Sequence, residues 1–292
     1  MKTTHKQVTN LLPSVTIDMG GFPVKQPMPT QKIQQVDPFL LLHHARTKYS
    51  DRRPARAQGV GPHPHRGFSP VTFVIEGEVH HRDSWENNQI AKQGEVQWMH
   101  AGAGIVHSER PSEALVARSG HQEIVQLWIN SPASAKMKPP EYYYVSNDVM
   151  CTFTSEDKKI TNKLIAGDYG GHQGNIIPQS DLLVMWSEGE KDGTQKVDIP
   201  KGYNSMLYTI KGDISIKGYG LVEKEHLVVF DQAEGIIEVT FKEKGQYLLV
   251  CGKPIDEKVT QSGPYVMNTQ TEVLEAMRDY QMGKMGILIE ED

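Results

Sequence analysis

The sequence predicts an all-β protein that ends in one short helix. Before residue 270 the chain is mostly short runs of β-branched and aromatic residues, separated by Gly, Pro, Asn and Asp. Such a pattern is typical of a sandwich or a barrel. A similar arrangement of glycines and apolar runs occurs twice along the chain, and helical periodicity is confined to its last part. These three observations favour two similar β-domains followed by a helix.

The length and composition agree with two domains. A chain of 292 residues exceeds the roughly 150 residues of one average domain. The net charge of −5 is spread without a basic stripe, so we expect no direct nucleic-acid binding. The two cysteines lie far apart, which fits a reducing compartment. No apolar run approaches the ~20 residues of a membrane span and no signal peptide is evident. We therefore expect a soluble, cytoplasmic protein.

The internal repeat predicts domains of residues 1–145 and 146–292. Gly67 and Gly77 flank one apolar run, and Gly202 and Gly212 flank another with the same ten-residue spacing. This alignment places His63 opposite Asp198, His65 opposite Pro200, His107 opposite Glu238 and Glu109 opposite Thr240. The second half would therefore lack every histidine discussed below. We expect one functional site, in the N-terminal domain only.

The predicted helix covers residues 271 to about 282. Thr269 and Glu272 have the spacing of a capping box, in which each side chain bonds the other residue's backbone N–H. Gly283 is a natural end for this helix. We also expect a strand from residues 1–34 to lie across the second domain.

Two short clusters contain the side chains that predict chemistry. His63 and His65 are two residues apart, as are His107 and Glu109. In a strand, residues two apart point to the same face, so each pair can point inward together. Three imidazoles and one carboxylate suit a first-row transition metal better than calcium, which prefers oxygen ligands. Such a set leaves one or two coordination positions for water or substrate.

Other residues near these clusters have simpler expected roles. His80 and His81 alternate along a strand, so only one can face inward. His100 is expected at the rim of the barrel. Trp98 and Met99 are expected in the hydrophobic core, with an aromatic wall of the pocket as the alternative role for them.

Several segments, in order along the chain, resemble the pirin branch of the cupins. They are His63-Pro64-His65-Arg66-Gly67-Phe68, Glu76-Gly77-Glu78-Val79, His81-Arg82-Asp83-Ser84, Gln97-Trp98-Met99, Gly104-Ile105-Val106-His107-Ser108-Glu109, Gly252-Lys253-Pro254-Ile255 and 263–269. The resemblance covers roughly residues 35 to 286. It implies two tandem cupin barrels, each a jelly roll, with the metal site in the first.

The resemblance also implies a metal and an activity. It favours Fe(II) among the divalent metals that the ligands allow, with copper, nickel, manganese and zinc as alternatives. Pirin-like proteins include ones with quercetin 2,3-dioxygenase activity, which uses dioxygen to open a flavonol ring and releases carbon monoxide. On this hypothesis His63, His65, His107 and Glu109 bind the metal, and Glu109 also accepts the substrate proton.

The alternative hypothesis is a metal-binding regulatory protein that acts through protein partners, as a transcriptional co-regulator does, without turnover. The basic segment from Arg46 to Arg56 is its docking candidate; this segment is otherwise a solvated loop or a lid over the barrel. One departure from the family pattern concerns both hypotheses. Most relatives carry a carboxylate four residues after the second histidine, where this chain has Ser69.

Overall fold

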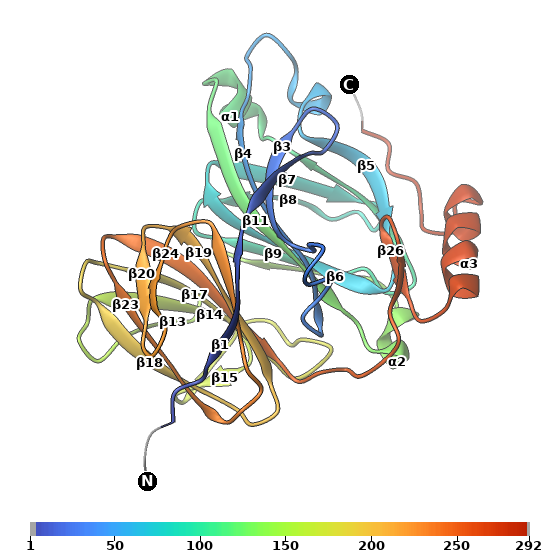
Figure 1. Ribbon diagram of the computed structural model, residues 1–292. Coiled ribbons are helices and arrows are strands. Elements are labelled where there is room, and N and C mark those ends of the chain that lie inside the picture. The colour runs from blue at the N-terminus through green and yellow to red at the C-terminus, as the bar shows by residue number, and fades with distance from the viewer. Residues whose placement is uncertain (1–3, 291–292) are drawn as a thin grey trace. The chain divides into compact units, whose positions relative to one another are not determined.

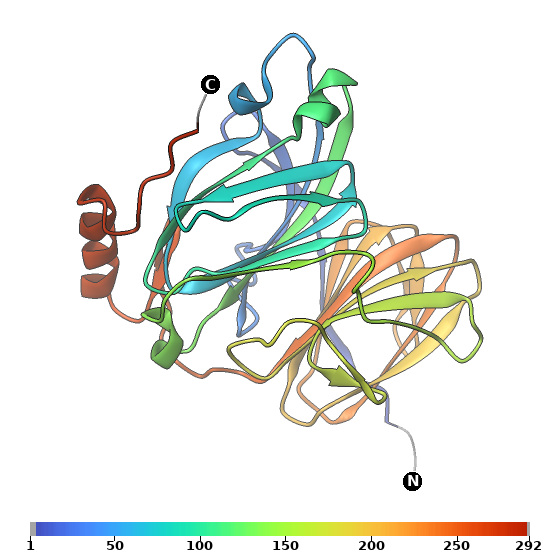
Figure 2. The ribbon, with the colours of Figure 1, turned by 180° about the vertical axis from the view of Figure 1, so that it is seen from behind.

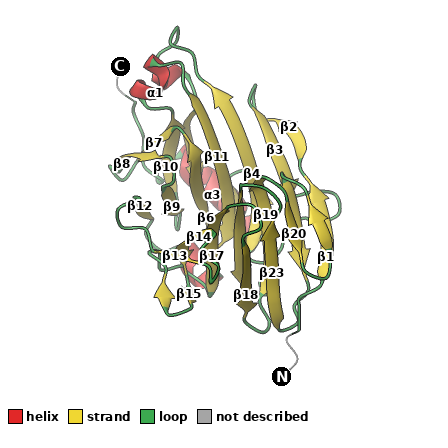
Figure 3. Cartoon of the chain, turned by 90° about the vertical axis from the view of Figure 1, so that its left-hand side faces the viewer, coloured by secondary structure: helices red, strands yellow, loops and turns green. Residues whose placement is uncertain are grey.

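A computed structural model describes residues 4–290 and confirms an all-β chain with a C-terminal helix (Figures 1 and 3). The described residues fall into two compact units. The N-terminal barrel consists of residues 17–24, 39–148 and 256–290, and the C-terminal barrel consists of residues 4–16, 25–38 and 149–255. None of the described helices is long and apolar enough to cross a membrane.

The structure differs from the expected division into residues 1–145 and 146–292 at both ends of the chain. The change of unit falls at residues 148 and 149, close to the expected boundary. Residues 4–16 and 25–38, however, group with the C-terminal barrel, and the C-terminal helix groups with the N-terminal barrel. Strand β1 (Val8–Pro13) pairs with β22 (His226–Phe230) and covers its edge, which protects backbone groups that would otherwise be unpaired. The expected strand across the second barrel is thus present.

The N-terminal barrel is built from two facing sheets and a hairpin. Its strands are β4 (Phe39–Lys48), β5 (Val60–His65), β6 (Phe68–Glu76), β7 (Glu78–Asp83), β8 (Asn88–Lys92), β9 (Val96–His100), β10 (Ile105–Arg110), β11 (His121–Asn130), β12 (Glu141–Val145), β25 (Thr260–Ser262) and β26 (Tyr265–Met267). Its helices are η1 (Ala55–Ala57), α1 (Glu113–Ala117), α2 (Ala133–Lys136) and α3 (Gln270–Gln281). One sheet has the order β5-β10-β7-β8. The other has the order β12-β9-β6-β11-β4. Strands β2 (Val15–Asp18) and β3 (Pro23–Met28) each contain residues of both units.

The C-terminal barrel repeats this strand order. Besides β1 and β22, its strands are β13 (Thr152–Thr154), β14 (Ile160–Ala166), β15 (Asp168–Tyr169), β16 (His172–Gln173), β17 (Leu182–Gly189), β18 (Thr194–Ile199), β19 (Asn204–Lys211), β20 (Ile214–Ile216), β21 (Gly220–Val222), β23 (Gly235–Phe241) and β24 (Gly245–Gly252). Its sheets have the orders β18-β23-β20-β21 and β1-β22-β19-β24-β17-β14-β13. The pair β18 and β23 therefore occupies the place that β5 and β10 occupy in the first barrel.

The sequence alignment of the two halves selected the wrong face of β18 and β23. Asp198 is exposed, and Glu238 points outward, where its carboxylate lies 2.9 Å from His5 Nε2. The inward positions are occupied by the buried Val197, Ile237 and Val239, which belong to one hydrophobic cluster. A slip of one residue moves every side chain of a strand to the other face, which explains the error. The conclusion that this pair of strands offers no imidazole still holds.

The C-terminal helix α3 begins at Gln270 with the predicted capping box. Thr269 Oγ1 accepts a hydrogen bond from the Glu272 backbone N–H, and the Glu272 carboxylate accepts one from the Thr269 N–H. Figure 1 shows α3 beside the strand β26, and Figure 2 shows the same helix from behind. On this helix Asp279 receives two hydrogen bonds of 3.1 Å from the buried guanidinium of Arg66. Because Arg66 directly follows β5, the helix holds the end of the strand that carries two of the histidines.

Gly67 forms the sharp turn between β5 and β6. Its φ of 85° lies in the left-handed region, where residues with a Cβ are disfavoured. A Cβ at this position would also lie 2.0 Å from the Val266 carbonyl oxygen. Buried Lys136 completes this corner, because its Nζ donates to the carbonyls of Gly67 and Val266 and to Asn130 Oδ1. The turn that follows His65 is thus fixed on several sides.

Candidate metal centre

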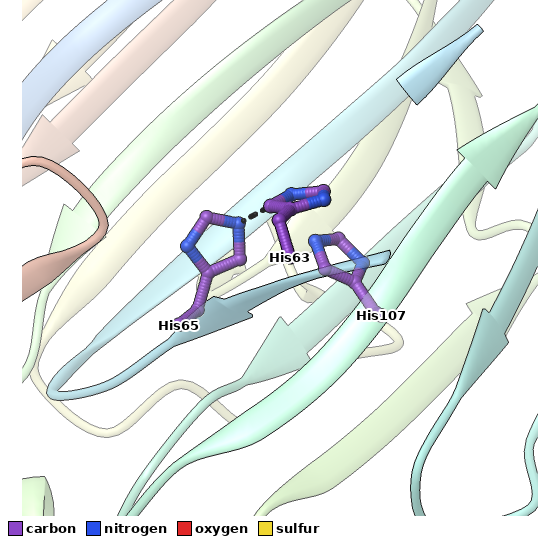
Figure 4. A group of neighbouring side chains, drawn as sticks. All are labelled: His63, His65 and His107. Atoms are coloured by element: carbon purple, nitrogen blue, oxygen red, sulfur yellow. Dashed lines mark hydrogen bonds between the residues drawn. The ribbon is translucent and has the colours of Figure 1, made fainter. Parts of the chain in front are cut away.

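Three imidazoles gather on the inner face of the β5–β10 pair. His63 and His107 are directly opposite each other in the antiparallel register, and His65 lies two residues further along β5. One ring nitrogen from each of the three histidines lies within 4.8 Å of the others (Figure 4). Alternation along β5 and the cross-strand register therefore produce the cluster that the His-x-His spacing predicts.

Hydrogen bonds determine which nitrogen of His63 is available. Its Nδ1 lies 2.8 Å from the Gly61 carbonyl oxygen, which can only accept, so Nδ1 carries the proton. In the neutral ring, Nε2 then carries no hydrogen and has a free lone pair. This atom lies 3.1 Å from His65 Nε2. Figure 4 shows these two rings close to each other on one strand and His107 on the neighbouring strand.

The buried histidines are held in the neutral form. Burial, followed by the neighbouring His63 imidazole, lowers the pKa of both His65 and His107 well below the usual value. His107 Nε2 is buried and has no hydrogen-bond partner among the described residues. An unpaired polar atom in such a place is unfavourable by about 1–3 kcal/mol, so it needs a ligand to satisfy it.

The three histidines fit a divalent transition metal. Nitrogen ligands bind such ions at about 2.0–2.1 Å, so nitrogens around one ion lie about 3–4 Å apart. The 3.1 Å separation of His63 Nε2 and His65 Nε2 meets this condition, and an imidazole that binds a metal must be neutral. Among residues 4–290 this is the one group of three or more such side chains placed to hold a metal ion.

Glu109 lies near the cluster but outside the three-residue group. A bulge between His107 and Glu109 shifts the register of β10. The Glu109 carboxylate reaches the facing sheet, where Gln126 Nε2 donates to its oxygens at 3.0 and 2.9 Å and Thr72 Oγ1 donates at 3.0 Å. Glu109 thus bridges the two sheets, and its roles as fourth ligand and as base remain predictions.

His81 contacts His107, and Asp83 in turn contacts His81. The His107 Nδ1 atom is 3.4 Å from His81 Nδ1, and His81 Nε2 is 2.9 Å from Asp83 Oδ2. His81 also stacks on Tyr142, with ring centroids 4.2 Å apart. His81 is buried while His80 bonds Asn88 on the outward face, so the prediction that only one of the two faces inward is confirmed.

Aromatic side chains of the seven-stranded sheet line the cluster next to His65. The rings of Phe68 and Trp128 have centroids 5.0 and 5.3 Å from that of His65. Trp128 Nε1 also donates to Gln126 Oε1 at 3.0 Å. Sequence reasoning missed Trp128, Gln126 and Thr72. The available signal was a polar residue, Gln126, alternating with apolar ones in the middle of a long strand.

Ser69 faces away from the cluster. Its hydroxyl lies 2.7 Å from His100 Nδ1, and both residues are buried. Because Phe68 contacts His65 and Thr72 contacts Glu109, the even positions of β6 face the cluster and Ser69 faces the opposite side. The expectation that His100 lies at the rim is therefore wrong. Trp98, next to it, is 1% exposed and belongs to the core as expected.

Comparisons with known proteins agree with this architecture. The Pirin family model matches residues 21–129, and the model of the Pirin C-terminal cupin domain matches residues 185–286. A Pseudomonas aeruginosa protein named "Putative quercetin 2,3-dioxygenase" is 36% identical over 90% of this chain and 92% of its own length. Human Pirin is 28% identical over 98% of this chain and 96% of its own length.

A solved structure of similar fold extends the comparison. The crystal structure titled quercetin 2,3-dioxygenase from Acinetobacter baumannii has a TM-score of 0.90 and 30% identity, covering 98% of this chain and 100% of that one. Two jelly-roll barrels with one histidine cluster define a bicupin. Within that class the chain belongs to the pirin family.

Proposed function

We propose that this chain is a metal-dependent dioxygenase that acts on flavonols or related enols. The observation that carries the proposal is the cluster of three imidazoles, with the buried Nε2 of His107 unpaired among the described residues. The names of the Pseudomonas and Acinetobacter relatives support the choice of reaction class. On this proposal His63, His65 and His107 hold one divalent metal, with Fe(II) the favoured ion.

The bound metal would act as a Lewis acid that lowers the pKa of a coordinated substrate hydroxyl and holds substrate and dioxygen together. Glu109 is the carboxylate beside the cluster that can accept the proton of that hydroxyl. Its oxygens already accept three hydrogen bonds from Gln126 and Thr72. An ionised carboxylate has about four lone-pair sites, so one site is left to accept the substrate proton. Gln126 and Thr72 orient this base.

The aromatic residues near His65 provide the other part of a flavonol site. Phe68 and Trp128 present apolar ring surface beside the imidazoles. Flat aromatic ligands bind well against such side chains, and apolar walls exclude water that would compete for the metal.

The test is turnover of quercetin by the iron-loaded protein. The purified chain is loaded with Fe(II) under anaerobic conditions, mixed with quercetin and exposed to air, while flavonol absorbance and carbon monoxide are measured. We expect loss of the flavonol with one carbon monoxide per molecule, abolished in His65→Ala. His226→Gln is the matched control, at a histidine of the other barrel whose ring bonds the Lys224 carbonyl. Bound iron without turnover would refute the dioxygenase and favour the regulatory alternative.

A further inference from the structure

His81 and Asp83 form a hydrogen-bonded chain that ends at His107. Asp83 is 4% exposed, His81 3% and His107 2%, so water does not compete for their bonds. The chain runs from Asp83 Oδ2 to His81 Nε2, and from His81 Nδ1 to His107 Nδ1. Each step joins two specific atoms, so the position of one proton constrains the next.

The hydrogen bonds of Asp83 determine which atom donates in each contact of this hydrogen-bonded chain. Its Oδ1 accepts hydrogen bonds from the backbone N–H groups of Trp85 and Asn87, at 2.9 and 3.1 Å. Its Oδ2 accepts one from Asn87 Nδ2 at 2.8 Å. With donors on both oxygens the carboxyl acts only as an acceptor. His81 must therefore donate its Nε2–H to Asp83.

A neutral His81 that is protonated at Nε2 has a lone pair at Nδ1. That lone pair faces His107 Nδ1, so His107 must donate the hydrogen in this contact. The remaining nitrogen of His107, Nε2, is then unprotonated. This is the buried atom that has no protein partner. A charged His81 would donate instead, and would also place a positive charge one ring away from a metal cation.

We propose that Asp83 and His81 are positioning residues that hold His107 in the tautomer with a bare Nε2, and so set the affinity of the centre for its metal. The inference rests on the proposed role of His107 as a ligand. The hydrogen bonds from Trp85 and Asn87 fix the Asp83 carboxylate in place, so its contact with His81 is part of the structure of the barrel. Comparable partners of metal-binding histidines typically change metal affinity by about 10- to 100-fold when they are removed.

Asp83→Asn is the sharpest substitution. The two backbone N–H groups would keep the amide oxygen at the Oδ1 position, which directs the amide NH₂ toward His81 Nε2; the Asn87 amide would turn so that its oxygen accepts from this NH₂. His81 would then be protonated at Nδ1 and would donate to His107, whose proton would move to Nε2. The substitution reverses donor and acceptor in both hydrogen bonds while it preserves the size of the side chain.

The experiment reads the tautomers directly. In the full-length metal-free protein with ¹⁵N-labelled histidine, two-bond ¹H–¹⁵N spectra should show His107 protonated at Nδ1 and His81 at Nε2. The pattern should reverse in Asp83→Asn, and the affinity for Co(II), from a competitive titration, should fall by about 10- to 100-fold. His80→Gln, on the outward face of the same strand, should change neither.

Two results would overturn the proposal. One is a wild-type spectrum in which His107 carries its proton at Nε2 or His81 is doubly protonated; this result needs no variant to fold. The other is an Asp83→Asn protein that folds and binds Co(II) as tightly as the wild type. Failure of the dioxygenase proposal would appear separately, as absence of flavonol turnover with tautomers and Co(II) binding intact.

Discussion

The two barrels share one strand order but place different side chains inside corresponding strands. In the N-terminal barrel the β5–β10 pair points His63, His65 and His107 inward. In the C-terminal barrel the β18–β23 pair points apolar residues such as Val197 and Ile237 into a closed hydrophobic cluster. The fold therefore forms without imidazoles at this place. The histidines of the first barrel are best explained by ligand binding.

The polar groups inside the barrels differ in the same way. In the C-terminal barrel Asn162, Ser187, Gln195 and Tyr247 bond one another in a buried network. In the N-terminal barrel His107 Nε2 is left without a partner. Among the described residues, the N-terminal barrel thus leaves an imidazole nitrogen free inside its histidine cluster, whereas the buried atom left without a partner in strand β19 of the C-terminal barrel is the Ser205 hydroxyl.

The largest effect should follow removal of one imidazole. In His107→Ala we expect metal binding to weaken by more than the about 100-fold that loss of an outer hydrogen-bond partner causes. The reason is that a direct ligand is lost. Metal content after dialysis, measured by mass spectrometry, with the unfolding transition as a check on folding, tests this. Full metal content in a folded His107→Ala protein would refute the three-histidine centre.

Glu109→Gln should separate the two roles predicted for the carboxylate. The amide keeps an oxygen that can accept from Gln126 and Thr72 but is no base. We expect flavonol turnover to fall by about 10²-fold or more, the usual contribution of a positioned base. A ligand role would add a loss of metal affinity in the same variant. Unchanged turnover and unchanged affinity together would remove Glu109 from the site.

Transfer of a histidine into the other barrel should be destabilising. Val197 is 1% exposed within an apolar cluster. Val197→His buries a larger ring without a hydrogen-bond partner, so we expect a loss of about 2–4 kcal/mol of unfolding free energy. Urea denaturation measures it. A neutral effect would show that the second interior is less closed than the structure indicates.

A buried lysine gives the N-terminal barrel a distinctive pH dependence. Burial lowers the pKa of Lys136 to about 8, whereas an unfolded lysine titrates near 10.4. Between these values the unfolded chain binds more protons, so stability from this group increases as pH rises from about 8 to 10. We expect wild type to gain about 1–3 kcal/mol relative to Lys136→Met between pH 7 and pH 10. Parallel pH profiles in urea would contradict this.

The smallest effect on stability should come from an apolar replacement within the cluster. His65 packs against Phe68 and Trp128. We expect His65→Leu to abolish metal binding while the metal-free protein keeps its stability within about 1 kcal/mol, because removing the buried Nδ1 of His65, unpaired among the described residues, offsets the loss of its contact with His63. Thermal unfolding of the metal-free proteins checks it. A large destabilisation would assign His65 a structural role instead.

Local spacing predicted much of this molecule. The period of two along strands places His63, His65 and His107 correctly, and the capping box at Thr269 predicts α3. These features depend on residues close in sequence. Contacts between sheets, such as Gln126 with Glu109, depend on pairings that spacing does not encode.

Two errors have the same origin. The alignment of the halves assigned Asp198 and Glu238 to ligand positions, because a one-residue slip is invisible in short apolar runs. His100 was expected at the rim from its spacing to His107, and its burial against Ser69 of another strand could not be read from that spacing. The exchange of terminal segments between the units likewise depends on long-range pairing, that of β1 with β22.

The most direct test is a crystal of the chain grown after loading with Fe(II), measured at the iron absorption edge. The account predicts one anomalous peak per chain, within bonding distance of nitrogens from His63, His65 and His107, and none inside the C-terminal barrel. A peak elsewhere, or an iron-loaded chain without a peak at these three histidines, would contradict it.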